Sequence, residues 1–267
     1  MRSKVTIILC MALISACATS PTGRKQFMLV SEEQAIADSK LAYTQMLAPL
    51  EREGRIDNDP QVRDRVIQIT SRLVAQATRM RPDTAKWQWG MKVIDDPKTV
   101  NAWCMAGGRM AIYTGLLQKV EPTDDELAQV IGHEIAHALA KHQAEKMSVG
   151  LASSIGVFAI GVATDSRVAV TGAAAAAALA IQLPNSRSAE SEADHIGIEL
   201  AAKAGFDPRA AVTLWRKMSK VGGSRPPQFL STHPSPDTRI EALAKLAPTM
   251  MPVYQRALQG PIPVHPL

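Results

Sequence analysis

The sequence has few aromatic residues, no run of basic residues and only three cysteines. Aromatic residues make up 4% of its 267 residues, and its formal net charge is +5. Nucleic-acid-binding surfaces gather lysine and arginine on one face, so this charge distribution does not predict a nucleic-acid partner. Hydrophobic residues make up 46% of the chain, which is enough for a sizeable core in one main domain.

Residues 1–16 are predicted to be a secretory signal of the lipoprotein type. A basic start with Arg2 and Lys4 precedes about ten apolar residues, too few for a membrane-spanning helix. The small residues before Cys17 resemble a bacterial lipobox, after which Cys17 is the lipidated first residue. An ordinary cleaved signal with an incidental cysteine is the alternative. Ala18 in the second position favours the outer membrane, with the protein facing the periplasm.

Lipidation of Cys17 would leave the mature chain with a single free thiol, that of Cys104. An intramolecular disulfide is then excluded, although the compartment is oxidising. Cys104 lies in an apolar segment, and we interpret it as a packed small hydrophobic residue rather than a nucleophile.

The segment Val130–Ala138 contains the pattern His-Glu-x-x-His within an apolar run. His133 and His137 are four residues apart, so on a helix they share one face, one turn apart. Two neutral imidazoles on one face are half of a tetrahedral zinc site, and Glu134 beside them has the position of a general base. The same pattern also occurs by chance on buried helices, so its meaning depends on the segments around it.

Capping patterns and hydrophobic spacing predict a fold that is α+β and mostly helical. Ser31–Gln34 opens a helix that runs to about residue 47, and Asp59-Pro60 starts a second helix. The alternation of large and small residues over Trp87–Val93 predicts a strand. Val100–Leu117 predicts two strands around a Gly107-Gly108 turn, followed by a short helix.

The helix that carries His-Glu-x-x-His is predicted to start at the capping box Thr123–Glu126 and to continue to about Met147. On such a helix His142 lies on the face opposite the zinc ligands. The small sheet before it is predicted to offer its edge, Asn101–Met105, to an extended peptide. Residues 149–183 are small, apolar and almost uncharged, which favours a helical hairpin near the site; a transmembrane hairpin is the alternative.

The third zinc ligand is missing where metzincins have it, because Gln143 occupies the place of their third histidine. A gluzincin takes a glutamate from a later helix instead, and Glu190 and Asp194 share one face of the next acidic helix. Glu190 is predicted to bind zinc, while Asp194 accepts the far N–H of a ligating histidine and fixes its ring. An exposed acidic face is the alternative, and Glu192 is expected to be solvated.

Together these motifs resemble family forty-eight of the metallopeptidases, gluzincins that include HtpX, BepA, LoiP and the CAAX prenyl proteases. The resemblance covers about residues 95–246, and its further motifs are Ser186–Asp194 and His233-Pro234 with Arg239. It implies one Zn²⁺ ion per chain, with these residues in the site: His133, His137 and Glu190 as ligands, Glu134 as base, Asp194 as support, and Asn101, Ala102 and Trp103 as the substrate-pairing edge.

The resemblance also implies roles for His233 and Arg239. In some members a histidine at the place of His233 reaches the metal and restrains activity, whereas in others it faces the substrate carbonyl. A loop histidine without a role is the alternative for His233. Arg239 resembles the arginine that the family has near its site, and a helix-surface cation is the alternative.

The implied protein is a zinc metalloendopeptidase of protein quality control, which degrades misfolded or unassembled cell-envelope proteins on the periplasmic side of the outer membrane. Its expected partners are unfolded protein substrates, the outer membrane through the lipid anchor, and the outer-membrane assembly machinery. The alternatives are a chaperone-like assembly factor that uses the groove to bind clients, and an integral-membrane protease. The predicted segments are a signal peptide (1–16), a tether (17–30), the metallopeptidase domain (31–250) and an extended tail (251–267).

Overall fold

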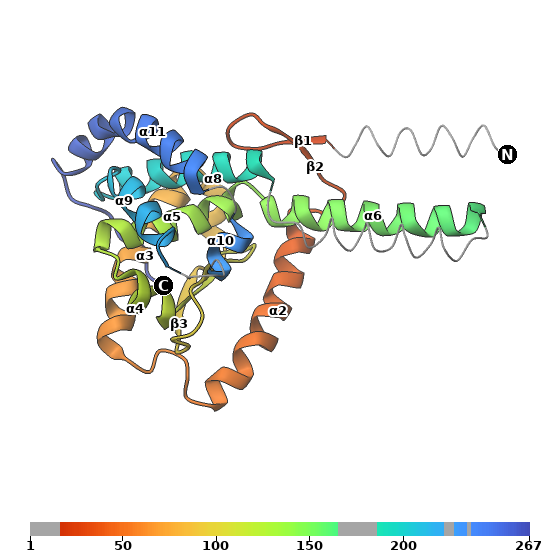
Figure 1. Cartoon of the computed structure of the whole chain (residues 1–267), viewed down its shortest axis with the longest axis horizontal. Coiled ribbons are helices and arrows are strands. Elements are labelled where there is room, and N and C mark those ends of the chain that lie inside the picture. The colour runs from red at the N-terminus through yellow and green to blue at the C-terminus, as the bar shows by residue number, and fades with distance from the viewer. Residues whose placement is uncertain (1–16, 165–185, 222–226, 234–235) are drawn as a thin grey trace. The chain divides into compact units, whose positions relative to one another are not determined.

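The computed structural model describes residues 17–164, 186–221, 227–233 and 236–267 (Figure 1). Two compact units are present. The larger consists of residues 36–140 and 184–267, and the smaller of residues 1–35 and 141–183. The predicted signal peptide lies outside the described residues.

The sheet of the larger unit has three strands, β3 (Gly90–Ile94), β4 (Ala102–Cys104) and β5 (Arg109–Tyr113), in the order β3-β5-β4. β5 pairs parallel with β3 and antiparallel with β4, so β4 is an edge strand. The predicted turn at Gly107-Gly108 is confirmed, because both glycines have positive φ, of 88° and 84°.

The predicted strand over Trp87–Val93 was placed too early, since β3 begins at Gly90. Trp87 instead ends the 3₁₀ turn η1 (Pro82–Lys86), and the indole of Trp89 donates a hydrogen bond to the Thr84 carbonyl. Both tryptophans are buried, with ring centroids 5.2 Å apart. The alternation reflected burial of two large rings rather than a continuous strand.

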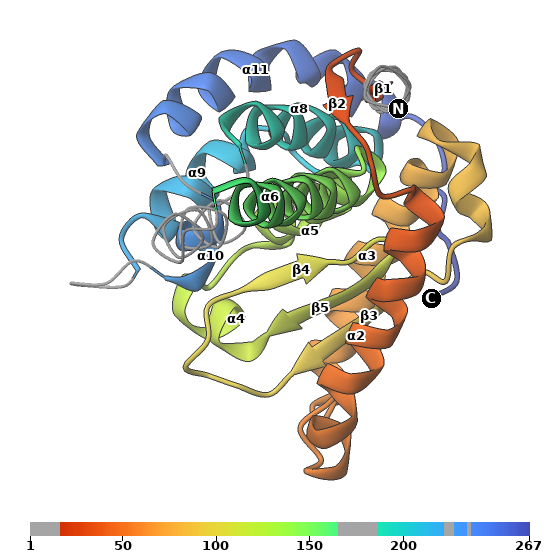
Figure 2. The ribbon, with the colours of Figure 1, turned by 90° about the vertical axis from the view of Figure 1, so that its right-hand side faces the viewer.

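Beside the sheet, the described part of the larger unit contains most of α2 (Glu32–Arg52) and the helices α3 (Pro60–Met80), α4 (Thr114–Val120), α5 (Asp124–Leu139), α8 (Arg187–Lys203), α9 (Ala210–Met218) and α11 (Pro236–Ala257). A short helix, α10 (Gln228–Thr232), precedes α11. α5 lies between β4 on one side and α8 on the other (Figure 2). Asp59 caps α3 and Thr123 caps α5, as predicted.

Two glycines set the distance between α5 and α8. A Cβ atom on Gly132 would lie 2.9 Å from the carbonyl oxygen of Gly197, and one on Gly197 would lie 2.9 Å from the backbone nitrogen of His133. The helices therefore touch backbone to backbone, which brings the histidines of α5 close to the acidic residues of α8.

The prediction that α5 continues to Met147 was wrong, because the helix ends at Leu139. Lys141 has a left-handed conformation with φ of 59°, and a new helix, α6 (His142–Thr164), begins after it. Arg81 donates a 2.8 Å hydrogen bond to the Leu139 carbonyl, which supplies a partner to the end of the helix. The argument that placed His142 on the opposite face of one straight helix therefore fails.

The smaller unit contains α6, the start of α2 (Glu32–Arg52) and a two-stranded hairpin of β1 (Cys17–Thr19) and β2 (Lys25–Phe27). Residues 17–30, predicted as a tether, contain this hairpin, and Arg24 forms two hydrogen bonds of 2.8 and 2.6 Å with Glu145 of α6. Ser148 accepts hydrogen bonds from the backbone of Leu29 and Val30. These contacts hold the hairpin in place.

The apolar segment 149–183 is helical as far as Thr164, and its remaining residues lie outside the described part of the chain. Among the described residues, none of the helices combines the length and the apolar character that crossing a membrane requires.

The last helix is longer than expected. α11 runs to Ala257 through Pro248 and Pro252, whereas an extended tail was predicted from residue 251. Leu243 and Ala247 are buried, so the packed face of α11 stabilises the helix. The residues after it have no regular structure, and His265 exchanges hydrogen bonds with Ser71 of α3.

Candidate metal centre

Four buried side chains converge in the larger unit: His133 and His137 of α5, Glu190 of α8, and His233 at the end of α10. Each offers one donor atom, and these atoms all lie within 4.8 Å of one another. Three of the four are the residues that the sequence predicts as zinc ligands. His233 completes the set.

The separations of the donor atoms fit a tetrahedral zinc ion. His133 Nε2 lies 3.0 Å from His137 Nε2 and 3.3 Å from His233 Nδ1. Glu190 oxygens lie 3.0 Å from His233 Nδ1 and 3.4 Å from the Nε2 atoms of His133 and His137. Zinc bonds of about 2.0–2.1 Å in a tetrahedron separate the ligand atoms by roughly 3.3 Å. Imidazole nitrogen and carboxylate oxygen are both zinc ligands, so the residues present fit one zinc ion.

Asp194 orients the first histidine of the cluster. Its Oδ1 lies 3.1 Å from His133 Nδ1, which leaves His133 Nε2 directed towards the other donors. Burial and the charge of Arg239 lower the pKa of His133, but hydrogen bonds to Asp194 and Glu190 outweigh both and raise it to about 9. Burial holds the pKa of His137 well below its usual value, so His137 is neutral and able to bind a metal.

Glu190 and Asp194 are held in their charged forms. Burial by itself raises the pKa of each carboxyl. Hydrogen bonds from His133, His137 and His233 outweigh it at Glu190, whose pKa is strongly lowered. At Asp194 the hydrogen bond with His133 and the charge of Arg239 lower the pKa. Two anionic groups therefore face the histidines, which favours a cation between them.

Glu134 is buried beside the cluster and lacks a complete set of partners. Its Oε1 makes no hydrogen bond in the described part of the chain and lies 3.4 Å from His233 Nε2. Burial raises the pKa of Glu134 above its ordinary value. A carboxylate with a free oxygen and a raised pKa is suited to accept and return a proton.

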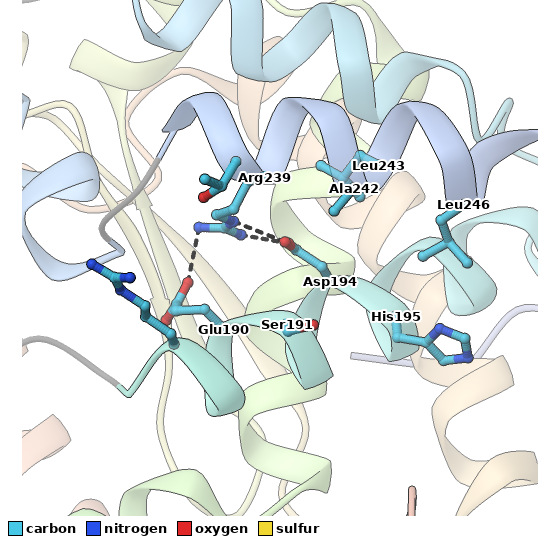
Figure 3. A pocket seen from close by; sticks show the side chains of 10 residues that line it. Glu190, Ser191, Asp194, His195, Arg239, Ala242, Leu243 and Leu246 are labelled. Carbon is cyan, nitrogen blue, oxygen red and sulfur yellow. Dashed lines mark hydrogen bonds and ion pairs between the residues drawn. The ribbon is translucent and has the colours of Figure 1, made fainter.

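Arg239 is buried rather than on the helix surface, and its guanidinium faces Glu190 and Asp194 (Figure 3). Its Nε donates a 2.8 Å hydrogen bond to Asp194 Oδ2, its Nη1 donates a 2.8 Å hydrogen bond to Glu190 Oε2, and its Nη2 bonds Asp194 Oδ1. The guanidinium carbon lies 3.7 Å from the ring centroid of Trp215. Trp215 was not predicted as part of the site, because no local signal in the sequence marks it.

The side chains of the expected substrate edge are buried or half-buried, and its backbone lies on the edge of the sheet. Ala102 is buried, and Trp103 packs edge-on against Tyr43 at 5.8 Å. Among the described strands, β4 pairs only with β5. Asn101 is buried just before β4, and its side-chain Oδ1 has no hydrogen bond among the described residues. Any pairing here therefore uses backbone groups of β4.

Two other residues near the site were also assigned from sequence. Cys104 has a raised thiol pKa because of burial and the negative charge of Glu134, consistent with a packed thiol rather than a nucleophile. Glu192 was expected to be solvated, but it is buried, with 5% of its surface exposed. The periodicity of α8 shows only that Glu192 points away from Glu190, and the packing beyond that face decides its burial.

The sequence of this chain is similar to those of known metallopeptidases. Residues 60–247 match the model of Peptidase family M48. The chain is 31% identical over 259 residues to "Metalloendopeptidase OMA1, mitochondrial" of Bos taurus, covering 91% of this chain and 49% of that protein. It is 40% identical over 157 residues to "Mitochondrial metalloendopeptidase OMA1" of Arabidopsis thaliana, covering 59% and 31%. It is 27% identical over 235 residues to "Beta-barrel assembly-enhancing protease" of Yersinia pestis, covering 84% and 45%. The chain thus spans less than half the length of each of these relatives.

Proposed function

The chain belongs to peptidase family M48, and we propose that it is a zinc-dependent endopeptidase that cleaves misfolded or unassembled cell-envelope proteins. The observation that carries the proposal is the buried, incompletely bonded carboxylate of Glu134 beside the four-donor cluster. A structural zinc site needs no such group, whereas peptide hydrolysis requires a base beside the metal.

His133, His137 and Glu190 would hold the zinc ion. When bound, zinc supplies Lewis-acid polarisation of the scissile carbonyl and acidifies the attacking water. Glu134 takes the proton of that water on its free Oε1 and delivers it to the leaving amine. Asp194 keeps the ring of His133 in place while the proton moves.

The edge strand β4 is proposed to bind the substrate. β4 is in contact with α5, so a peptide that pairs with the backbone of Asn101, Ala102 and Trp103 is held beside Glu134. Pairing through backbone hydrogen bonds requires an extended, locally unfolded chain and few specific side chains. This geometry suits a protease that acts on misfolded proteins.

His233 is proposed to restrain the enzyme. Its Nδ1 lies among the proposed zinc ligands, and its Nε2 lies 3.4 Å from Glu134 Oε1. The same imidazole ring is therefore next to both the metal cluster and the base. A catalytic zinc site keeps one position open for water or substrate. If His233 held the ion as well, its ring would have to move away before a peptide could be cleaved.

The cellular location is proposed from the sequence. A lipid on Cys17 would anchor the protein to the outer membrane with its site in the periplasm, where unassembled envelope proteins are accessible. The Yersinia pestis relative is named a beta-barrel assembly-enhancing protease, which supports the proposal that the substrates include proteins of outer-membrane assembly.

The test is the Glu134→Gln variant, assayed on a casein-type unfolded substrate and for bound zinc. We expect its proteolytic rate to fall by about 10²–10⁴-fold, because the amide cannot accept a proton, while zinc content stays at the wild-type level. Glu241→Gln, an exposed site on α11, is the matched control and should keep the wild-type rate. Equal turnover by Glu134→Gln and wild type would contradict the mechanism.

A second candidate is a chaperone-like outer-membrane assembly factor that binds clients at the same substrate site without routine cleavage. The observation in its favour is that four protein donors already complete the cluster, as in structural zinc sites. Client capture and client turnover, measured together for wild type and Glu134→Gln, distinguish the two. Capture by both, with no turnover by wild type, would favour the assembly factor.

A further inference from the structure

Both oxygens of Glu190 face the cluster, so its way of binding a metal is not fixed by position alone. Oε1 lies 3.0 Å from His233 Nδ1 and 3.4 Å from His137 Nε2. Oε2 lies 3.1 Å from His233 Nδ1 and 3.4 Å from His133 Nε2. A carboxylate at this position is able to bind a metal ion through one oxygen or through both.

Within the part of the chain that the structure describes, an arginine bonds Oε2 of this carboxylate. Arg239 Nη1 donates a 2.8 Å hydrogen bond to Glu190 Oε2. A charge-assisted hydrogen bond competes with a metal for the electrons of the oxygen that accepts it. Resting on the proposed zinc site, we propose that Arg239 is a positioning residue that makes Glu190 bind the metal through Oε1 alone.

The guanidinium is fixed well enough for this role. Asp194 accepts two hydrogen bonds from it, and the ring of Trp215 lies 3.7 Å beneath its central carbon. Arg239 has 5% of its surface exposed, so water competes little for its donors. The planar fork presents Nη1 to Glu190 while Nε and Nη2 hold Asp194, and a lysine ammonium cannot do both in fixed directions.

The same cation supports a second ligand indirectly. Asp194, which Arg239 holds, lies 3.1 Å from His133 Nδ1 and orients that ring. Glu190 and Asp194 are like charges on one face of α8, and the cation between them offsets their repulsion. One arginine from α11 thus orients a histidine of α5 and a glutamate of α8.

A groove between α8 and α11, of about 280 Å³, has Arg239 in its wall (Figure 3). Arg187 also lines this groove, but it is exposed and lies at the start of α8. Arg187 therefore provides a matched control, because it is an exposed arginine that lines the same groove.

The test uses the full chain as Arg239→Lys, Arg239→Gln and Arg187→Gln variants. The zinc dissociation constant is measured by chelator competition, and the metal geometry by the visible spectrum after Co²⁺ replaces zinc. We expect the dissociation constant of both Arg239 variants to rise about 10–100-fold, the usual effect of removing a group that supports a ligand. Their cobalt bands should weaken, because a second oxygen raises the coordination number above four. Arg187→Gln should match wild type.

Wild-type zinc affinity and cobalt spectrum in both Arg239 variants would overturn the inference, whatever their proteolytic rates. Arg239→Lys keeps the charge and the aliphatic stem, so it decides the question if Arg239→Gln does not fold. Failure of the wild-type chain to bind zinc would instead overturn the proposed function. The two failures are therefore distinguishable.

Discussion

Two buried glutamates on α5, Glu126 and Glu134, have opposite surroundings. Glu126 accepts hydrogen bonds from the backbone of Thr123 at 2.9 Å, the hydroxyl of Thr213 at 2.7 Å and the ammonium of Lys217 at 2.7 Å. Glu134 has an oxygen without a hydrogen bond in the described part of the chain. Burial raises the pKa of both; the partners of Glu126 reverse that shift, whereas Glu134 keeps a raised pKa.

This contrast separates a structural carboxylate from a chemical one. A buried charge with all its partners stabilises the fold, while one without them costs stability and remains available for reaction. The residue type and the helix are the same in both cases. The surroundings that α8, α9 and the end of α10 supply decide the role.

The substitution with the largest expected effect is Glu190→Gln, which removes a metal ligand of α8 that faces His133 and His137. The amide is a poor zinc ligand, so the zinc dissociation constant should rise by more than the roughly 100-fold typical of a lost supporting group. Chelator competition measures this, and Glu126→Gln is the matched control because it makes the same change outside the cluster. Unchanged zinc binding by Glu190→Gln would show that the cluster is not the metal site.

Glu126→Gln should destabilise the fold by about 1–3 kcal/mol at pH 7 and leave zinc affinity unchanged. The folded-state pKa of Glu126 is lowered, so the carboxylate stabilises the protein fully above its unfolded value near 4.5. That contribution is lost as pH falls through the folded-state pKa. Urea unfolding of the metal-free proteins at several pH values should therefore show the difference from wild type shrinking below about pH 4.5. A difference that is constant with pH would contradict this assignment.

His233→Ala should have the smallest effect, a proteolytic rate between unchanged and on the order of tenfold higher, with zinc retained. Removal of the ring opens the fourth ligand position and frees the surroundings of Glu134 Oε1. Turnover of an unfolded substrate, with zinc content measured in parallel, checks this expectation. A collapse of the rate with zinc still bound would show that His233 assists the reaction instead.

Local signals in the sequence were sufficient for several elements. The capping box at Thr123 and Glu126 fixed the start of α5, and the four-residue spacing of His133 and His137 put both rings on one face. The same spacing placed Glu190 and Asp194 together on α8. These features depend on helix geometry over one or two turns, which the sequence determines by itself.

The tertiary structure decided what depends on distant partners. α5 ends at Leu139 without a glycine or proline to mark the place, and the carbonyl there is bonded by Arg81, far away in the sequence. The burial of Arg239 against Trp215 likewise had no sequence signal. Helical spacing predicted which residues share a face, but only the backbone contact of Gly132 with Gly197 brings the two ligand-bearing faces together. Close approach is a property of pairs of elements, and local propensity carries no information about it.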